Sequence, residues 1–181
     1  MNSQELILKM DNVDNLVFRI AEEHDLPEIL SIYETNLVND YSLGADKLNE
    51  CKEDLTELFL SRNQYHNIWV ARDATNDQLL GWQSYFPIFH TPLKKGTAVE
   101  SSTYIKLDAQ KKGIAFPLMK YALNELAGSD EHFVYGFVNK YNYGAIKLVN
   151  KIGFLEVGSV PAFPSVFPYY FEKIMYIYVL K

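Results

Sequence analysis

The sequence contains very little cysteine or histidine. Cys51 is the only cysteine among 181 residues, so no intramolecular disulfide can form, and the four histidines are scattered. These residues do not form a cluster with the spacing of a structural zinc site. We therefore predict no metal, and a reducing, cytoplasmic setting.

Long hydrophobic runs and an excess of positive charge are also absent. No stretch approaches the length needed to cross a bilayer. Residues 1–15 mix acids, amides and one lysine and lack the apolar run of a signal peptide. The net charge of −6 argues against nonspecific binding to nucleic acid or to acidic membranes, because both require a positive field. We expect neither partner, whereas a cationic small molecule is compatible with the acidic balance.

The composition is that of an ordinary globular protein. Hydrophobic residues make up 48% of the chain and charged residues 22%, which is enough apolar material to close a sizeable core. The length suits one domain. We predict a weakly ordered N-terminal extension over residues 1–15 and a single domain over residues 16–181.

Hydrophobic periodicity and turn residues predict an alternation of strands and helices. Helix starts and ends are marked by Asp25 with Pro27, and by Gly128 and Gly153 as C-terminal caps. The expected strands are 17–21, 67–72, 79–86, 97–107, 132–138, 154–158 and 173–180, and the expected helices begin near 25, 45, 114 and 145. The order β-α-α-β-β-β-α-β-α-β-β is typical of an α/β domain with a mixed sheet and helices on its faces.

The segment from Tyr104 to Ala115 is the most informative part of the chain. A predicted strand runs into a short loop with two lysines and a glycine, and a helix follows directly. The first N–H groups of a helix lack internal partners and carry the positive end of the helix dipole, so they can hold a diphosphate. A plain strand-to-helix turn with solvated lysines is the alternative interpretation of the same pattern.

Two motifs resemble the hallmarks of the GNAT N-acetyltransferase superfamily. Residues 110–115, Gln-Lys-Lys-Gly-Ile-Ala, resemble its Gln/Arg-x-x-Gly-x-Gly/Ala pyrophosphate loop. Residues 139–154 resemble its second hallmark, which runs from an Asn to a closing Lys-x-Gly-Phe. Within the superfamily, residues 99–105 are similar to the strand of the phosphinothricin-type acetyltransferases, which reads Glu-x-Ser-x-Tyr.

The resemblance implies an acyl-CoA N-acyltransferase fold, with a mostly antiparallel central sheet and helices on both faces. It also implies acetyl-CoA as cosubstrate. Backbone groups of the strand end would bind the pantetheine arm, the loop would bind the pyrophosphate, and two asparagines would meet the pantetheine or the thioester. In this sequence these cofactor-binding residues are Ile105, Lys106, Leu107, Gln110, Lys111, Lys112, Gly113, Ile114, Ala115, Asn139 and Asn142. Asn142 can equally well cap the helix that follows it.

Acetyl transfer to an amine needs a base, because amine pKa values lie near 10. Glu100 is our candidate: strand alternation puts it on one face with Tyr104, and the phosphinothricin-type enzymes carry a Glu here. A carboxylate in an interior strand is costly unless it is used or paired. The alternative is that Glu100 pairs with a lysine or lies near a wet end of the sheet.

The sequence offers several candidates for the acid that protonates the leaving thiolate. Many family members carry a Tyr at the position of Val149, which has no proton to give. Tyr104, Tyr141 or Tyr143 can substitute, or the coenzyme A thiolate, with a pKa near 8.5, can leave largely unassisted. Of these, we place Tyr104 with Glu100 as a catalytic residue.

The sequence therefore predicts an N-acetyltransferase that moves an acetyl group to a primary amine, with a small molecule as acceptor. The alternative is a non-catalytic acyl-CoA-binding module of the same fold, which the missing tyrosine would suit. Residues 161–171 form an aromatic segment that would border the acceptor or a homodimer partner, or would cover the core. Tyr85, Phe86 and Phe89 are candidates for the opposite wall of the acceptor site.

Overall fold

The computed structural model describes residues 15–41, 43–88, 98–162 and 171–180. The N-terminal extension predicted for residues 1–15 and the centre of the aromatic segment, 163–170, therefore lie almost entirely outside the described residues. The strands are β1 Leu16–Ile20, β2 Ile68–Asp73, β3 Leu79–Pro87, β4 Ala98–Ile105, β5 Phe133–Asn139, β6 Leu155–Val160 and β7 Lys173–Val179. The α-helices are α1 Leu26–Tyr41, α2 Ala45–Leu60, α3 Ala115–Leu126 and α4 Tyr143–Ile152, and short 3₁₀ turns span Glu23–Asp25 and Leu107–Ala109.

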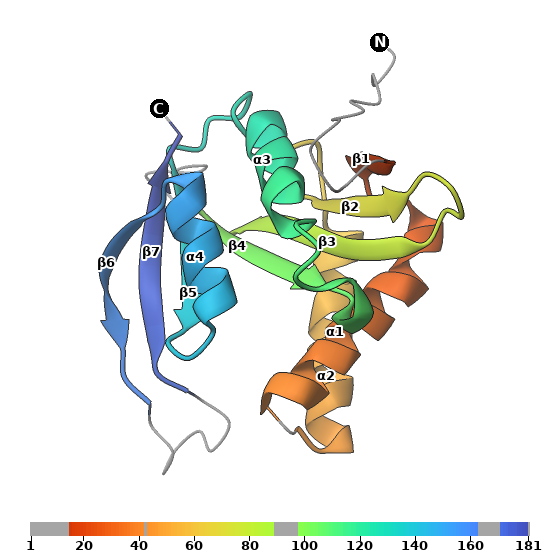
Figure 1. Cartoon of the computed structure of the whole chain (residues 1–181), viewed down its shortest axis with the longest axis horizontal. Coiled ribbons are helices and arrows are strands. Elements are labelled where there is room, and N and C mark those ends of the chain that lie inside the picture. The colour runs from red at the N-terminus through yellow and green to blue at the C-terminus, as the bar shows by residue number, and fades with distance from the viewer. Residues whose placement is uncertain (1–14, 42, 89–97, 163–170, 181) are drawn as a thin grey trace.

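These strands form one seven-stranded sheet in the order β1-β2-β3-β4-β5-β7-β6. Every neighbouring pair is antiparallel except β4 and β5, which run parallel. The predicted element order and the mostly antiparallel mixed sheet are thus confirmed. In Figure 1, β6 and β7 run steeply across the direction of β2 and β3.

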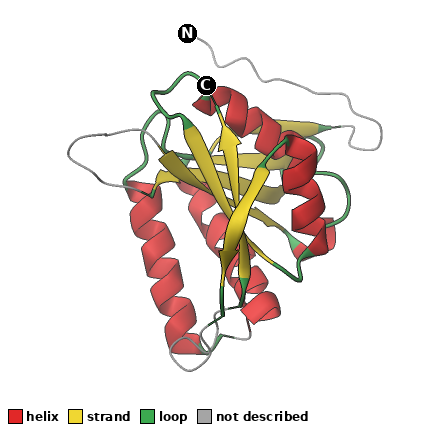
Figure 2. Ribbon diagram, turned by 90° about the vertical axis from the view of Figure 1, so that its left-hand side faces the viewer, coloured by secondary structure: helices red, strands yellow, loops and turns green. Residues whose placement is uncertain are grey.

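Helices cover both faces of the sheet, as predicted (Figure 2). Strand alternation explains the two layers, because successive side chains of β2 enter different cores. Trp69 and Ala71 belong to the core under α3 and α4, whereas Ile68 and Val70 belong to the core under α1 and α2. All four side chains are fully buried.

Helix ends follow the sequence signals in part. Asn142 caps α4 by accepting a hydrogen bond from the Ala145 N–H at 3.0 Å, and Gly153 ends α4 in the left-handed conformation, with φ 107°. The prediction of a left-handed cap at Gly128 is wrong, because α3 ends through the right-handed Ala127, and the described glycines with positive φ are only Gly113 and Gly153.

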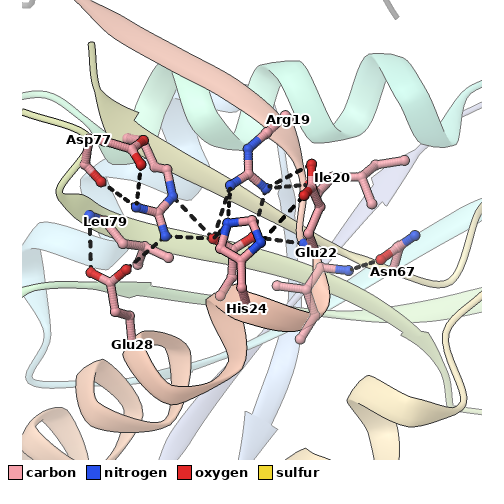
Figure 3. Close-up of polar contacts among 11 residues, drawn as sticks. Arg19, Ile20, Glu22, His24, Glu28, Asn67, Asp77 and Leu79 are labelled. Atoms are coloured by element: carbon pink, nitrogen blue, oxygen red, sulfur yellow. Dashed lines mark hydrogen bonds and ion pairs between the residues drawn. The ribbon is translucent and has the colours of Figure 1, made fainter. Parts of the chain in front are cut away.

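A buried ion-pair network joins β1, β2 and the start of α1 (Figure 3). Asp25, which is fully buried, accepts hydrogen bonds from Arg72 at 2.6 Å and from Arg19 at 2.6 Å. Arg72 also donates to Glu28 at 2.7 Å and to the carbonyl of Asp77. Asp25, which was expected to mark the start of the helix, therefore acts mainly as the partner of these two arginines, which fix the start of α1 to β1 and β2.

Two further observations concern the described residues alone. None of their helices is both long enough and apolar enough to cross a membrane. Their His, Cys, Asp and Glu side chains do not gather in threes in a way that could hold a metal ion.

Candidate acetyl-CoA and acceptor site

The parallel strands β4 and β5 separate partway along their length. Their pairing covers only three positions, Ala98 with Phe133, Val99 with Val134 and Glu100 with Tyr135. The antiparallel pairing of β4 with β3 continues to Ile105. Residues 101–105 therefore remain paired with β3 on one side and are not paired with β5 on the other, and we call this unpaired side of β4 the opening.

The hydrogen bonds between β4 and β3 show which backbone groups of β4 face this opening. Lys106 N–H donates to the Leu80 carbonyl at 2.9 Å. In an antiparallel pair, alternate residues point both backbone groups at the partner. Even-numbered residues of β4 thus bond to β3, whereas Ser101, Thr103 and Ile105 direct N–H and C=O towards the side where β5 has turned away. This is an open strand edge inside a sheet.

The loop between β4 and α3 has two residues in the left-handed conformation. Lys111 has φ 62° and Gly113 has φ 85°. Lys111, Lys112 and Gly113 are exposed, and α3 begins two residues later at Ala115. The loop thus presents backbone groups and two cations beside the start of a twelve-residue helix, which is an arrangement suited to a diphosphate.

The other predicted loop residues lie around this segment. Ile114 is buried in the core, so only its backbone can meet a ligand. Lys106 forms an ion pair with Asp108 at 3.5 Å, and Leu107 is 41% exposed. Gln110 turns its side-chain amide inward and donates to the Asn36 side chain at 3.2 Å.

Glu100 and Tyr104 lie on the sheet face covered by α1 and α2, as strand alternation predicts. The Tyr104 ring lies 5.0 Å from Tyr33, edge-on, and 4.7 Å from Trp82, measured between ring centroids. Burial raises the pKa of the Tyr104 hydroxyl well above its usual value, and the nearby Tyr33 and Glu100 add to the rise. Tyr104 therefore stays protonated at neutral pH.

The carboxylate of Glu100 is at the point where the two strands separate. Its side chain is accessible to water, yet the surrounding protein displaces part of its hydration. This partial burial raises its pKa above the usual 4.5, while the positive charge of Lys173 acts in the opposite direction. Burial likewise lowers the pKa of Lys173, and Glu100 opposes that shift. The alternative that Glu100 interacts with a lysine is thus partly correct, and Lys173 is that lysine.

Aromatic side chains extend this region towards the end of α1. The ring of Tyr41, the last residue of α1, lies 5.7 Å from that of Phe171. Tyr41 also contributes to the raised pKa of Tyr104. The region around Tyr104 is therefore bordered by the end of α1 and by the residues just before β7.

Three of these residues, Tyr41, Lys173 and Asn36, do not follow from the sequence motifs. They belong to α1 and to β7, and only the folded chain brings them to β4. The sequence offered one partial signal, the concentration of aromatic residues before the last strand.

The two asparagines of the second motif take local structural roles. Asn139 ends β5 and accepts a hydrogen bond from the Tyr141 N–H at 2.9 Å. Asn142 caps α4, so one of its two predicted roles is present. Val149 is 5% exposed and packs in the core under α4. Tyr141 and Tyr143 are exposed at 63% and 69%.

The predicted wall formed by aromatic residues after the third strand needs correction. Tyr85 is fully buried and packs against Trp69, with ring centroids 5.5 Å apart, in the core under α3 and α4, so it lies on the sheet face away from Glu100. Phe86 lies on the face covered by α1 and α2, directly opposite Glu100 in the pairing of β3 with β4, and is buried there. Phe89 lies outside the described residues.

Comparison with known proteins agrees with this geometry. The model of the acetyltransferase (GNAT) family matches residues 26–154. An L-methionine sulfoximine/L-methionine sulfone acetyltransferase of Pseudomonas aeruginosa is 30% identical over 147 residues, covering 79% of this chain and 82% of the relative. YwnH of Bacillus subtilis, provisionally assigned as a phosphinothricin acetyltransferase, is 28% identical over 146 residues, covering 81% and 88%.

A solved structure shows the same fold with a cofactor. YncA of Salmonella typhimurium, provisionally assigned as an acetyltransferase and solved with acetyl-CoA, superposes with a TM-score of 0.72 at 20% identity, covering 93% of this chain and 95% of that one. The chain belongs to the acetyltransferase (GNAT) family. Its class of activity is acetyl transfer from acetyl-CoA, and the open edge of β4 and the loop before α3 fit that cosubstrate.

Proposed function

We propose that the protein transfers the acetyl group of acetyl-CoA to the primary amine of a small molecule, with Glu100 as general base. One observation carries the proposal: Glu100 occupies the last paired position before β4 and β5 separate. The carboxylate thus lies next to the open strand edge and on the face bordered by α1. A base at this point can serve an amine that enters from the α1 side.

The cofactor would be held mainly by backbone groups. The N–H and C=O groups of Thr103 and the N–H of Ile105 suit the amide groups of a pantetheine arm, because such an arm can pair with a strand edge as another strand would. The loop at Lys111 and Gly113 and the first turn of α3 suit the pyrophosphate. Lys112 adds positive charge from the exposed side of the loop.

Glu100 would remove the proton that blocks attack. An alkyl ammonium has a pKa near 10, so at neutral pH it must lose a proton before its lone pair can attack a carbonyl carbon. Partial burial raises the pKa of Glu100 and makes it a better proton acceptor, while the positive charge of Lys173 limits the rise. The new C–N bond forms, the C–S bond breaks, the attacking nitrogen gives up a second proton to become the amide, and the thiolate takes up one proton.

Tyr104 is the candidate donor of that last proton. The Tyr104 hydroxyl stays protonated because burial raises its pKa. Residues 100, 102 and 104 share one face of β4, so Tyr104 is on the same face as Glu100. The buried Val149 has no proton to donate. Direct departure of the thiolate is the alternative.

The acceptor would be an amino acid or a similarly small amine. The two named relatives are described as acting on methionine sulfoximine, methionine sulfone and phosphinothricin, and each of these compounds carries a primary amine. Tyr33, Tyr41 and Tyr104 offer aromatic surface, and Lys173 offers positive charge, on the side from which the acceptor would enter. The predicted homodimer stays a prediction that sedimentation velocity would measure.

Release of free coenzyme A from acetyl-CoA tests the proposal. We expect turnover with at least one member of a panel of amino acids and polyamines that includes methionine sulfoximine. Glu100→Gln should lower kcat by about 10²-fold or more, the usual effect of losing a general base, with little change in the KM for acetyl-CoA. Glu53→Gln, on the exposed face of α2, is the matched control. Unchanged turnover in Glu100→Gln would remove Glu100 from the mechanism.

A further inference from the structure

We propose that Asn36 of α1 is a positioning residue for cofactor binding, because it replaces the hydrogen bond that β5 no longer gives to the end of β4. This inference rests on the proposed function of the open strand edge. Asn36 is distant from the two sequence motifs, yet its side chain reaches both the strand end and the first residue of the loop motif.

The side-chain amide of Asn36 has hydrogen bonds at each of its polar atoms. Its Nδ2 donates to the Ile32 carbonyl at 2.8 Å, within α1, and to the Ile105 carbonyl at 3.1 Å. Its Oδ1 accepts from Gln110 Nε2 at 3.2 Å. Asn36 is only 5% exposed. A buried amide bonded in this way has a fixed orientation, since any rotation leaves a polar group unpaired.

The Ile105 carbonyl needs such a donor because of the separation of β4 and β5. It points towards the side where β5 has turned away, so a strand cannot satisfy it there. Asn36 supplies the main hydrogen bond, and Gln110 Nε2 approaches the same oxygen at 3.4 Å. The Ile105 N–H and the backbone groups of Thr103 remain directed into the opening, where a pantetheine arm would pair with them.

The neighbouring strand makes this position sensitive. A Cβ atom added to Gly81 would lie 2.5 Å from the Ile105 side chain and 2.8 Å from the Tyr104 carbonyl oxygen, so β3 is already in close contact with this part of β4. The end of β4 is therefore held between Gly81 on one side and Asn36 on the other. A shift at Ile105 moves the loop that follows, because Lys106 leads directly into the 3₁₀ turn at Leu107–Ala109.

The same helix also contacts the acceptor side. Tyr33 lies one helical turn before Asn36, on the same face of α1, and packs edge-on against Tyr104. Thus α1 touches two consecutive residues of β4, Tyr104 through a ring and Ile105 through an amide. We infer that α1 sets the position of the cofactor strand and of the acceptor wall together.

Calorimetric titration of the full-length protein with coenzyme A tests this role without requiring turnover. Asn36→Asp keeps the size of the side chain but places an acceptor against the carbonyls of Ile32 and Ile105. We expect binding about tenfold weaker or more, as for a lost buried hydrogen bond. At saturating acetyl-CoA, kcat should stay within a few-fold of the wild-type value, which separates positioning from catalysis.

Asn67→Asp is the matched control. Asn67 is also 5% exposed, and its amide donates to the Asn63 carbonyl at 2.8 Å and accepts from Ile68 N–H at 2.8 Å. The melting temperature of Asn67→Asp should fall by about as much as that of Asn36→Asp, but its affinity for coenzyme A should equal that of the wild-type protein. Asn36→Ser, which removes the reach to Ile105 without adding charge, should weaken binding even if the aspartate variant does not fold.

The outcomes are distinct. Weaker coenzyme A binding in the Asn36 variants, with normal binding in Asn67→Asp, supports the proposal. Equal affinity in all folded variants overturns it, and the hydrogen bonds of Asn36 are then merely structural. If the wild-type protein itself does not bind coenzyme A, it is the proposed function that fails.

Discussion

Glu100 of β4 and Tyr135 of β5 form the last paired position between two parallel strands, and beyond this pair the strands separate. A sheet that opens in this way exposes backbone hydrogen-bonding groups in the middle of a folded domain, where they must find other partners. The side chain at the point of separation is a carboxylate. Ligand binding and proton transfer can therefore take place side by side.

Gly113→Ala tests whether the loop conformation serves the cofactor. Any side chain at φ 85° is strained, so the variant should lose about 1–2 kcal/mol of stability. Gly153→Ala is the control, because Gly153 has φ 107° and an added Cβ there meets only Tyr178, at 3.8 Å. We expect similar losses of melting temperature but weaker acetyl-CoA binding only in Gly113→Ala. Equal affinities would show that the loop is a structural turn.

Two substitutions at Asn142 separate helix capping from cofactor contact. Asn142→Ala removes the acceptor for Ala145 N–H and should cost about 1 kcal/mol. Asn142→Asp restores a good cap and should restore the melting temperature. If the side-chain amide also meets the pantetheine, Asn142→Asp will still raise the Kd for coenzyme A. Full recovery of affinity in Asn142→Asp would leave capping as its only role.

Tyr104→Phe removes one hydroxyl while keeping the ring that packs against Tyr33 and Trp82. The melting temperature should change little. If the hydroxyl protonates the leaving thiolate, kcat should fall by about 10²-fold, with KM for acetyl-CoA nearly unchanged. A wild-type kcat would mean that the thiolate leaves without this acid. Measuring rates with thioesters of different leaving-group pKa would confirm which case holds.

The buried network at Asp25 makes stability depend on pH. Burial acts to raise the pKa of Asp25, but hydrogen bonds from Arg19, the Glu22 N–H and Arg72 outweigh it, so the pKa is lowered from the usual 3.8. This stabilisation is fully present above pH 3.8 or so and is lost as the pH falls through the lower folded-state pKa. Asp25→Asn should cost about 3 kcal/mol, because it removes the one fully buried carboxylate that Arg19 and Arg72 share.

The measurement is urea unfolding of wild-type protein and Asp25→Asn between pH 2 and pH 7. The wild type should lose stability at the acid end, and the difference between the two proteins should narrow there. A constant difference across this range would mean that Asp25 does not titrate with a lowered pKa. Glu53→Gln again serves as the control for removal of an exposed carboxylate.

Local signals predicted most of the fold. Alternation and turn residues placed all seven strands and four helices in the correct order, and Gly153 ended its helix as expected. Gly128 did not adopt the left-handed conformation, because Ala127 already completes the last turn of α3. A glycine after a helix permits that conformation without requiring it.

The sequence predicted the part of the candidate site that is formed by a single strand and the loop after it. The positions of Glu100, Tyr104 and Gly113 follow from strand alternation and from a contiguous motif. Asn36 was missed because its importance depends on a hydrogen bond to Ile105, 69 positions away in the sequence. Lys173 was missed because its charge acts on Glu100, 73 positions away. Neither residue belongs to a local sequence pattern from which an interaction with a distant strand could be predicted.

The pH dependence of kcat/KM for the amine, in wild-type protein and in Glu100→Gln, tests the central claim most directly. Because partial burial raises the pKa of Glu100, the wild-type rate should fall on the acid side at a pH above the usual range of a glutamate. Glu100→Gln should be slow at every pH and should lack this acid limb. A glutamine variant that keeps both the limb and the rate would contradict the assignment of Glu100 as the base.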